Sequence, residues 1–420
     1  MPVPDSRLSR FKDRLGELFA LRFESKIWII ALLNLLSAAG FSLTIPFLSL
    51  YLFQDRGVSM TLIGTIILAG GILSAATHML GGELSDRLGR RPILLISNGV
   101  RVLMFLGMAV LIGNSAPVWA ISLVYILGQS IGMVVRPVLS AMVVDLVPKR
   151  RLTETYGFLR VAVNLGWAIG PAVGGYLATF LHYSWLFGVA ALITSLGFFI
   201  VLFFIRESLH KTDAVTVTPR YSLLKDRFFL LFTGLSFLII LVAAQMMSTL
   251  SVFSVDRLGM STAQYGLLLT VNGLVVVLFQ YPTARIVNSM IKSRVLIVGS
   301  LLYAVGYLLF GWIEGFSLAV VAMIIITLGE IVFSPVALSI VGELAPGKHR
   351  GRYMGFYELS HTLGFTAGPL AGGLLMDAFP MRSLPIWGTI ALTAVAVGLG
   401  FHFIRKKINQ ISPRRMIKLK

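Results

Sequence analysis

Long apolar runs recur along the whole chain and constrain its fold more than any other feature of the sequence. Each run holds about 20 apolar residues, the length that a helix needs to cross the hydrocarbon core of a bilayer. Of the 420 residues, 56% are hydrophobic and 13% are charged, whereas soluble domains carry about 25% charged residues. The pattern predicts an all-α membrane protein. It excludes a soluble enzyme, a disordered chain and a β-barrel, whose spans are shorter and alternate in polarity.

Twelve apolar runs are expected to form transmembrane helices, six on each side of a polar stretch at 206–228. They lie at 27–52, 60–82, 92–113, 118–146, 154–181, 184–205, 229–254, 262–284, 294–313, 317–344, 352–375 and 385–404. The polar stretch is the expected linker between an N-terminal six-helix bundle, 27–205, and a C-terminal one, 229–404. Polar segments at 1–26 and 405–420 flank the two bundles.

The positions of the basic residues predict the orientation of the chain. The formal charge is +18, but Lys and Arg gather in short clusters between apolar runs rather than in a nucleic-acid-binding patch. With the N-terminus in the cytoplasm, 30 of the 36 Lys and Arg fall on the cytoplasmic side. Cytoplasmic loops carry such an excess. We therefore expect both termini in the cytoplasm of a plasma membrane of the bacterial inner-membrane type, with no nucleic-acid partner.

The two halves of the sequence repeat each other. A shift of 198 residues places Pro137 on Pro335 and Asp145 on Glu343, and a shift of 202 lays the second apolar run on the eighth. Two bundles repeated in the same orientation imply a pseudo-two-fold axis along the membrane normal. In such architectures the ligand site lies between the halves, near the middle of the membrane.

The loop between the second and third runs, residues 82–92, carries an Asp-Arg-x-Gly-Arg-Arg order. This segment resembles the loop signature of the major facilitator superfamily, and the twelve runs and the linker extend the resemblance over nearly the whole chain. The resemblance implies that Asp86, Arg90 and Asp145 form a charge cluster that latches the outward-open state and breaks when the cytoplasmic side opens. The second half has Asn288 at the position of the acid, so the resemblance does not extend to a second latch.

The fifth and eleventh runs share a spacing of small residues. The matching positions are Gly157, Gly166, Gly170, Pro171, Gly174 and Gly175, and Gly355, Gly364, Gly368, Pro369, Gly372 and Gly373. Glycines at these intervals let a neighbouring helix approach closely, and proline permits a bend, so plain helix packing explains the spacing as well. The spacing also resembles the antiporter signature of the superfamily, which implies export by exchange.

Ionisable residues within apolar runs are functional candidates because they are costly in a bilayer. Glu330 lies near the middle of the tenth run. An apolar setting favours the neutral form of a carboxyl, and a carboxyl that can be neutral or ionised is what proton coupling needs. A structural ion pair or a hydrogen-bonded neutral acid is the alternative. A mid-membrane acid at this place also resembles the proton-coupled multidrug antiporters.

Further charged residues within the runs are candidates for the cavity. The repeat places Arg136 and Glu330 at similar depth, so Arg136 could pair with Glu330, shape the field of the cavity, bind backbone carbonyls or hold an anionic substrate head group. Arg160 aligns with Glu358, and His361 lies one helical turn further on. Glu358 and His361 are expected to form a second proton site or a gating pair near the cytoplasmic end.

The first run is informative because residues 27–54 contain no Asp, Glu, Lys or Arg. Many proton-coupled drug exporters of the superfamily carry an acid there, so the coupling would fall to Glu330, with Asp145 and Glu358 as further candidates. Substrate-lining candidates are Asn34, Phe41, Thr44, Gln245, Met246 and Phe333. Methionine adapts to apolar ligands, but packing against lipid or core explains each of these residues equally well.

The sequence lacks the signatures of other functions. It has no Gly-x4-Gly-Lys-Ser/Thr phosphate loop, no cysteine and six scattered histidines. We therefore expect no enzyme, no cofactor and no metal site. The resemblance implies a secondary transporter working by alternating access, driven by a proton gradient and exporting amphipathic or lipophilic small molecules. Its partners would be substrate, protons and the lipid bilayer, and it would act as a monomer, as members of that family usually do.

Two rival hypotheses stay open. The first is a transporter of the same family for a specific metabolite, anion or lipid. The second, from another class, is a transporter-like receptor or sensor, which would show no accumulation or counterflow of any ligand.

Overall fold

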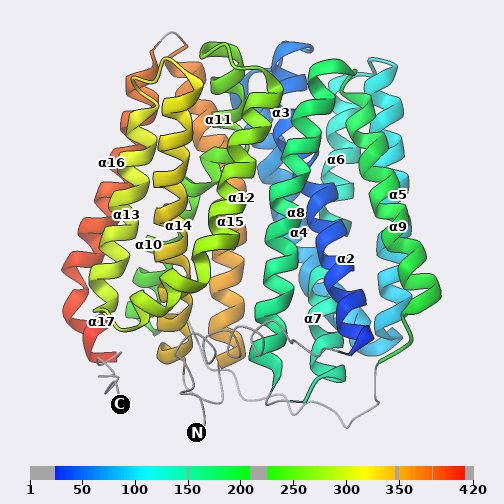
Figure 1. The fold of residues 1–420 in the computed structure, drawn as a ribbon, viewed down its shortest axis with the longest axis horizontal. Helices are drawn as coiled ribbons and strands as arrows, with labels where there is room; N and C mark the ends of the chain where they lie inside the picture. Colours follow the sequence, from blue (N-terminus) through cyan, green and yellow to red (C-terminus); the bar gives the residue numbers. More distant parts are fainter. Residues whose placement is uncertain (1–23, 149–150, 209–224, 346–349, 381, 412–420) are drawn as a thin grey trace, which may run out of the picture.

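The computed structural model describes residues 24–148, 151–208, 225–345, 350–380 and 382–411. Most of the predicted N-terminal segment, linker and basic tail lies outside these ranges. Within them every regular element is helical, and the predicted all-α membrane fold is confirmed (Figure 1). Eleven spans of this part of the chain are long and apolar enough to cross a membrane.

The N-terminal half contains six spans made from eight helices. They are α2 (Ser25–Ser42), α3 (Ile45–Gln54), α4 (Met60–Leu88), α5 (Arg90–Gly113), α6 (Val118–Gly132), α7 (Val135–Leu146), α8 (Leu152–Phe180) and α9 (Ser184–Phe204). The first and fourth spans were expected to be continuous, but each is broken in two. Proline removes the hydrogen bond to the carbonyl four residues earlier, so Pro46 and Pro137 explain why α2 ends at Ser42 and α6 at Gly132.

The C-terminal half repeats this plan with six spans and a short final helix. Its elements are α10 (Arg227–Ala243), η3 (Ala244–Met247), α11 (Thr249–Val252), η4 (Phe253–Arg257), α12 (Thr262–Asn288), α13 (Lys292–Leu309), α14 (Phe316–Leu344), α15 (Arg350–Ala378), α16 (Ser383–Phe403) and α17 (Arg405–Ile411). The seventh span is composite: α10 is followed by one turn of 3-10 helix, the short α11 and one turn of π-helix. Pro335 lies inside an unbroken α14, unlike its repeat partner Pro137.

The eleventh predicted span, α15, is the one long helix of the described part that its composition alone would not place in a membrane. It is 29 residues long and carries Glu358, His361 and Asp377 among its glycines. It packs against α4 of the other half and against α10, and its Asp377 carboxylate bonds to the start of α4. It was nevertheless predicted as one of the twelve apolar runs, at 352–375, and the repeat with the fifth run agrees with that position.

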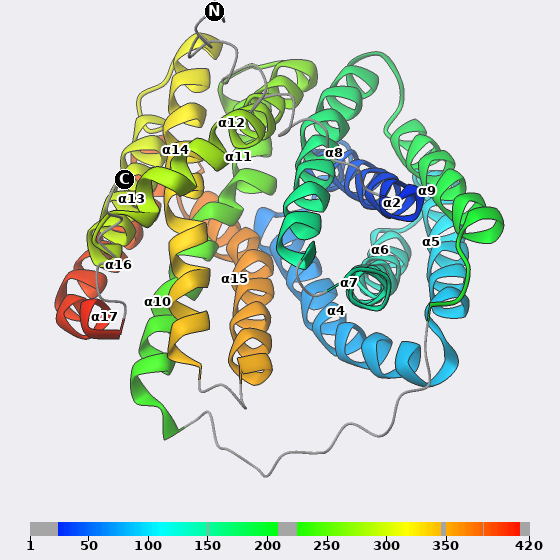
Figure 2. The ribbon, with the colours of Figure 1, turned by 60° about the horizontal axis from the view of Figure 1, so that its bottom comes forward.

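The two halves stand side by side and meet along two helix pairs, α4 with α15 and α8 with α12 (Figures 1 and 2). We call the side on which α2 begins and α16 ends the terminal face. The halves join on the opposite face. There the carboxylate of Asp377 accepts hydrogen bonds from the backbone N–H groups of Met60, 3.1 Å, and Thr61, 2.8 Å. The hydroxyls of Thr179 and Thr262 lie 2.8 Å apart.

Toward the terminal face the halves diverge. A methyl group added at Gly157 of α8 or at Gly355 of α15 would meet nothing within 4 Å, and Tyr156 is 39% exposed. Among the described residues, the hydrogen-bonded contact between halves nearest to this face is that of Arg160 with Gln280, at 3.4 Å. The molecule is therefore joined at the opposite face and open toward the terminal face.

Candidate functional site

Glu330 lies in the middle of α14, where this helix packs against α12 and α13. The Asn272 side chain of α12 donates hydrogen bonds to the Glu330 carboxylate, 3.1 Å, and to the Thr327 hydroxyl, 2.9 Å. Glu330 is partly exposed, and it forms no ion pair within the described part of the chain. Its partner is a neutral amide on a neighbouring helix, an arrangement that can accept either protonation state of the carboxyl.

Arg160 of α8 is the cation that faces Glu330 from the other half. Its charge lies within electrostatic range of Glu330, and its guanidinium donates to the Gln280 side chain of α12. Gln280 in turn donates to the backbone carbonyl of Ile331, 3.3 Å away. The N-terminal half is therefore linked through two side chains to the backbone beside Glu330. The sequence singled out Arg160 but did not connect it with Glu330.

A second group of ionisable side chains lies nearer to the terminal face. His78 of α4 and Arg136 of α7 come from one half, and Glu358 and His361 of α15 from the other. Each histidine lies within electrostatic range of both Arg136 and Glu358. Arg136, Glu358 and His361 are exposed. The direct pair of Arg136 with Glu330, which the repeat allowed, is absent, because Arg136 lies with this second group. The gating or proton-transfer role of Glu358 and His361 stays a prediction.

The predicted charge cluster is present. Arg90 at the start of α5 pairs with Asp86, donates to the Ser85 hydroxyl at 2.8 Å and places its Nε 3.3 Å from the Asp145 carboxylate of α7. The Ser208 hydroxyl donates to the same carboxylate at 3.0 Å. The ion pairs are intact although the halves diverge at this face. Any latching role must therefore act through contacts between the halves, and that role stays a prediction.

Glu207 completes this end of the N-terminal half, and the sequence analysis did not single it out. Its carboxylate accepts the backbone N–H groups of Arg90, 2.9 Å, and Arg91, 3.1 Å. These are among the groups that a helix start leaves without partners, and Gly89 before them has a φ of 102° that favours glycine. The start of the linker is therefore fixed to the start of α5.

The shared small residues, five glycines and one proline in each half, bring helices together at five of their six positions. A methyl at Gly166 would lie 2.6 Å from the Leu35 carbonyl oxygen of α2, and one at Gly364 would lie 2.8 Å from the Phe237 carbonyl oxygen of α10. Gly170 and Gly174, and Gly368 and Gly372, repeat these contacts, while Gly175 and Gly373 meet the other half, and Pro171 and Pro369 offer carbonyls there. Gly157 and Gly355 pack against nothing here, so close packing does not explain them.

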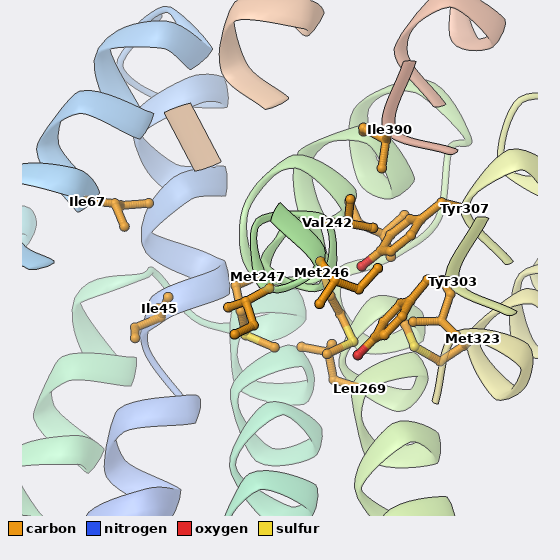
Figure 3. Packing of buried hydrophobic residues seen from close by; sticks show 14 of the residues in the cluster. Ile45, Ile67, Val242, Met246, Met247, Leu269, Tyr303, Tyr307, Met323 and Ile390 are labelled. Carbon is orange, nitrogen blue, oxygen red and sulfur yellow. The ribbon is translucent and has the colours of Figure 1, made fainter. Parts of the chain in front are cut away.

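The substrate-lining candidates of the C-terminal half are packing residues in this structure. Gln245 is fully buried and donates to the Gly368 carbonyl at 2.9 Å, which joins the seventh span to α15. Met246 lies among Val242, Leu269 and Tyr303 in the buried cluster (Figure 3). Phe333 packs on Phe401 of α16 with ring centroids 5.8 Å apart, away from the other half. The prediction that they line an open site is wrong for this state.

The candidates of the N-terminal half have a different setting. Asn34 bonds to its own helix at the Ile30 carbonyl, 2.9 Å. Phe41 and Thr44 instead line a cavity inside the half, together with Arg101 of α5. Arg101 was not among the predicted site residues, although, like Arg136, it is an arginine within an apolar run.

The comparisons with known proteins agree with this geometry. The family model described as Major Facilitator Superfamily matches residues 30–264 and 235–416. Quinolone resistance protein NorA of Staphylococcus aureus is 25% identical over 365 residues, 85% of this chain and 91% of that protein. A Na(+), Li(+), K(+)/H(+) antiporter of Planococcus maritimus is 24% identical over 403 residues, 87% of this chain and 92% of that protein.

Among solved structures, the fold is similar to that of a POT family transporter in complex with 5-aminolevulinic acid. The TM-score is 0.79 at 16% identity, with 93% of this chain and 98% of that chain covered. At this identity the likeness supports the arrangement of the helices and carries no information about what is transported.

Proposed function

The chain belongs to the major facilitator superfamily, and we propose that it is a proton-coupled exporter of amphipathic or lipophilic compounds that works by alternating access. The placement of Glu330 carries the proposal. Its carboxyl lies mid-membrane, is held by the neutral Asn272 amide and lies within range of Arg160 in the other half. Export is supported by the small-residue spacing of α8 and α15, and by the printed names of two relatives, a quinolone resistance protein and a cation/proton antiporter.

The proposed cycle uses the attraction between the halves. Ionised Glu330 attracts Arg160, whereas protonated Glu330 does not, so the two protonation states favour different arrangements of α8 and α14. A proton that binds the two arrangements with different affinity biases the equilibrium between them. Protonation of Glu330 from outside competes with substrate binding and favours return of the carrier. Release of that proton inside then resets the carrier.

The positive-inside pattern assigns the terminal face to the cytoplasm of a plasma membrane in this proposal. The structure then represents the state open to the cytoplasm, in which substrate enters. In that state the pairs of Arg90 with Asp86 and Asp145 persist within one half. The latch would therefore depend on what this cluster contacts across the halves in the outward-open state.

The test is substrate-driven proton movement in proteoliposomes. We expect ethidium to release protons from liposomes that hold the wild-type protein at an imposed pH gradient, and Glu330→Gln to abolish this release. Glu314→Gln, at an exposed acid in the loop before α14, is the matched control and should leave the release unchanged. Unchanged coupling in Glu330→Gln would remove Glu330 from the mechanism.

A second candidate function is transport of an anionic metabolite or lipid. This candidate is favoured by two exposed cations, Arg136 of α7 and Arg160 of α8. The same liposomes distinguish the candidates. Several unrelated lipophilic cations driving proton release support drug export, whereas a response to one anion or one lipid alone supports the second candidate. Absence of counterflow for every compound supports a receptor or sensor.

A further inference from the structure

The outer edge of the C-terminal half carries cations and no acids. It is formed by α13, α16 and α17, which contact one another on the side away from the N-terminal half (Figures 1 and 2). These three helices contain five Lys and Arg residues and no Asp or Glu. All five cations lie at the terminal face, because they belong to the first turn of α13 or to α17. A surface with one sign of charge attracts ions of the opposite sign.

Two of the five cations have partners within the protein. The Lys292 ammonium pairs with the Glu343 carboxylate at 2.8 Å, and the Lys407 ammonium lies over the Phe228 ring, 4.6 Å from its centroid. The other three cations are exposed and form no ion pair within the described part of the chain. We call these three residues the basic corner: Arg294 of α13, and Arg405 and Lys406 of α17.

The repeat shows how the first half neutralises the same place. The helices α9 and α16 are both 21 residues long, and a shift of 199 residues superimposes their bounds. This shift puts Arg405 at the position of Arg206 and Lys406 at the position of Glu207. In the first half the Glu207 carboxylate binds the start of α5. The second half has a cation where the first half has this acid, so a neutralising anion must come from outside these three helices.

Two columns of exposed apolar side chains lead to the basic corner. On α13, Arg294 is followed along one helix face by Val298, Leu301 and Val305, all exposed. On α16 the exposed column is Leu392, Leu399 and Phe403, and Phe403, two residues before Arg405, is 82% exposed. A contiguous apolar surface on membrane-spanning helices is covered by lipid chains. The basic corner therefore lies where these chains end, at the depth of the lipid head groups.

We propose that the basic corner binds an anionic phospholipid of the leaflet at the terminal face. The lipid phosphate accepts charge-assisted hydrogen bonds from Arg294, Arg405 and Lys406, since guanidinium and ammonium groups both bind phosphate. Its acyl chains lie along the exposed columns of α13 and α16. A soluble anion would use the cations alone, so the apolar columns favour a lipid as the source of the phosphate. The proposal goes beyond the proposed function and needs neither export nor proton coupling.

The test is lipid binding to the full chain in a non-ionic detergent, measured by native mass spectrometry. We expect phosphatidylglycerol to bind saturably and phosphatidylcholine, which has no net charge, to bind at least tenfold more weakly. Inorganic phosphate at the same concentrations should not displace phosphatidylglycerol. Equal binding of the two lipids would overturn the proposal. Displacement by inorganic phosphate would also overturn it, because the site would then serve a soluble anion.

A pair of variants assigns the lipid to the basic corner. Arg405→Gln should weaken phosphatidylglycerol binding about fivefold, the effect of one cation at an anionic head group. Arg206→Gln is the matched control, because Arg206 is exposed, occupies the repeat position of Arg405 and precedes Glu207. It should leave the affinity unchanged. Equal losses in the two variants would show that all cations of the terminal face share the lipid, and would contradict a site at this corner.

Lys406→Glu gives the second half the acid that the first half has at this position. The charge changes by two units, so phosphatidylglycerol binding should weaken about 25-fold and its preference over phosphatidylcholine should disappear. The unfolding temperature without added lipid should stay at the wild-type value, because Lys406 is exposed. A retained preference in a folded Lys406→Glu protein would overturn the proposal. These measurements use no substrate or gradient, so a failure of the Glu330→Gln coupling test leaves them unaffected.

Discussion

The ammonium of Lys292 lies 2.8 Å from a carboxylate oxygen of Glu343 and 2.7 Å from the Ser339 hydroxyl. The 202-residue shift that aligns α4 with α12 puts Lys292 at the position of Arg90. The 198-residue shift puts Glu343 at the position of Asp145. An ion pair between the start of one helix and the end of another is therefore present in both halves. The second half lacks the loop acid but keeps this pair.

The two pairs should differ in their contribution to stability. Arg90 binds two carboxylates, and that of Asp145 belongs to a side chain that is 20% exposed. Lys292 binds one carboxylate, that of Glu343, whose side chain is 42% exposed. The two cations themselves are similarly buried, at 8% and 11% exposed. We expect Arg90→Ala to lower the free energy of unfolding by about 2–3 kcal/mol, because it leaves the partly buried carboxylate of Asp145 without its ion-pair partner. Lys292→Ala should cost about 1 kcal/mol or less. Thermal unfolding of the purified variants in one detergent measures the difference.

Arg87→Ala is the control for this comparison. Arg87 pairs with Glu83, and the two side chains are 71% and 59% exposed, so its loss should leave the unfolding temperature unchanged. Equal losses for Arg90→Ala and Lys292→Ala would show that the second carboxylate and the deeper burial of Asp145 do not strengthen the first pair.

The carboxylate of Glu207 should stabilise the start of α5 in particular. It accepts two backbone N–H groups there, and a negative charge at a helix start also interacts favourably with the helix dipole. We expect Glu207→Ala to cost about 1 kcal/mol, as the loss of a helix cap does. Hydrogen–deuterium exchange should become faster in the first turn of α5 and remain unchanged in α13. Faster exchange throughout the half would indicate general unfolding and contradict a local cap.

The helix plan was largely predictable from the sequence. A bilayer demands long apolar helices, so apolar runs located the twelve spans, including the more polar α15, whose position the repeat also supports. The breaks were harder to predict. Pro137 breaks the fourth span whereas Pro335 lies in a continuous α14, so the surrounding packing decides the outcome.

The site was predictable only in part. Glu330 could be singled out because an acid in an apolar run is costly wherever the fold places it. The neutral residues of α12 around it could not: Asn272 donates to its carboxylate, and Gln280 donates to the backbone carbonyl of the next residue, Ile331. Phe333 was misassigned because the sequence does not show which face of α14 meets α16. These relationships depend on how each helix is rotated about its own axis relative to its neighbours. A single sequence does not reveal that rotation.

Gly175 should control the contact between α8 and α12 on the opposite face. A methyl group there would lie 2.5 Å from the Thr262 carbonyl oxygen and 3.0 Å from the Gly266 Cα, and backbone atoms cannot move aside cheaply. We expect Gly175→Ala to disfavour the state that is open toward the terminal face. An overlap that costs about 1.4 kcal/mol would change the ratio of states about tenfold.

The chain has no cysteine, so Tyr156→Cys supplies a single reporter near the terminal face for a membrane-impermeant maleimide. Labelling should slow several-fold when Gly175→Ala is added. Gly188→Ala is the control, because a methyl group there meets nothing within 4 Å. Slower labelling in both double variants would implicate helix stiffness rather than the contact between the halves.

Asp377 should hold the two halves together at the same face. Its carboxylate accepts the Met60 and Thr61 N–H groups at the start of α4, so it caps a helix of the other half. Asp377→Asn removes the negative charge and leaves one of these N–H groups without a strong acceptor. We expect a loss of about 1 kcal/mol in the preference for this state. Spin labels at Leu181→Cys and Glu314→Cys, both exposed and one in each half, should then report an added population at longer distance.

Asp256→Asn is the matched change, because Asp256 is an exposed acid with no hydrogen bond to the other half among the described residues. An unchanged distance distribution in Asp377→Asn, or the same change in Asp256→Asn, would show that this cap does not hold the halves together.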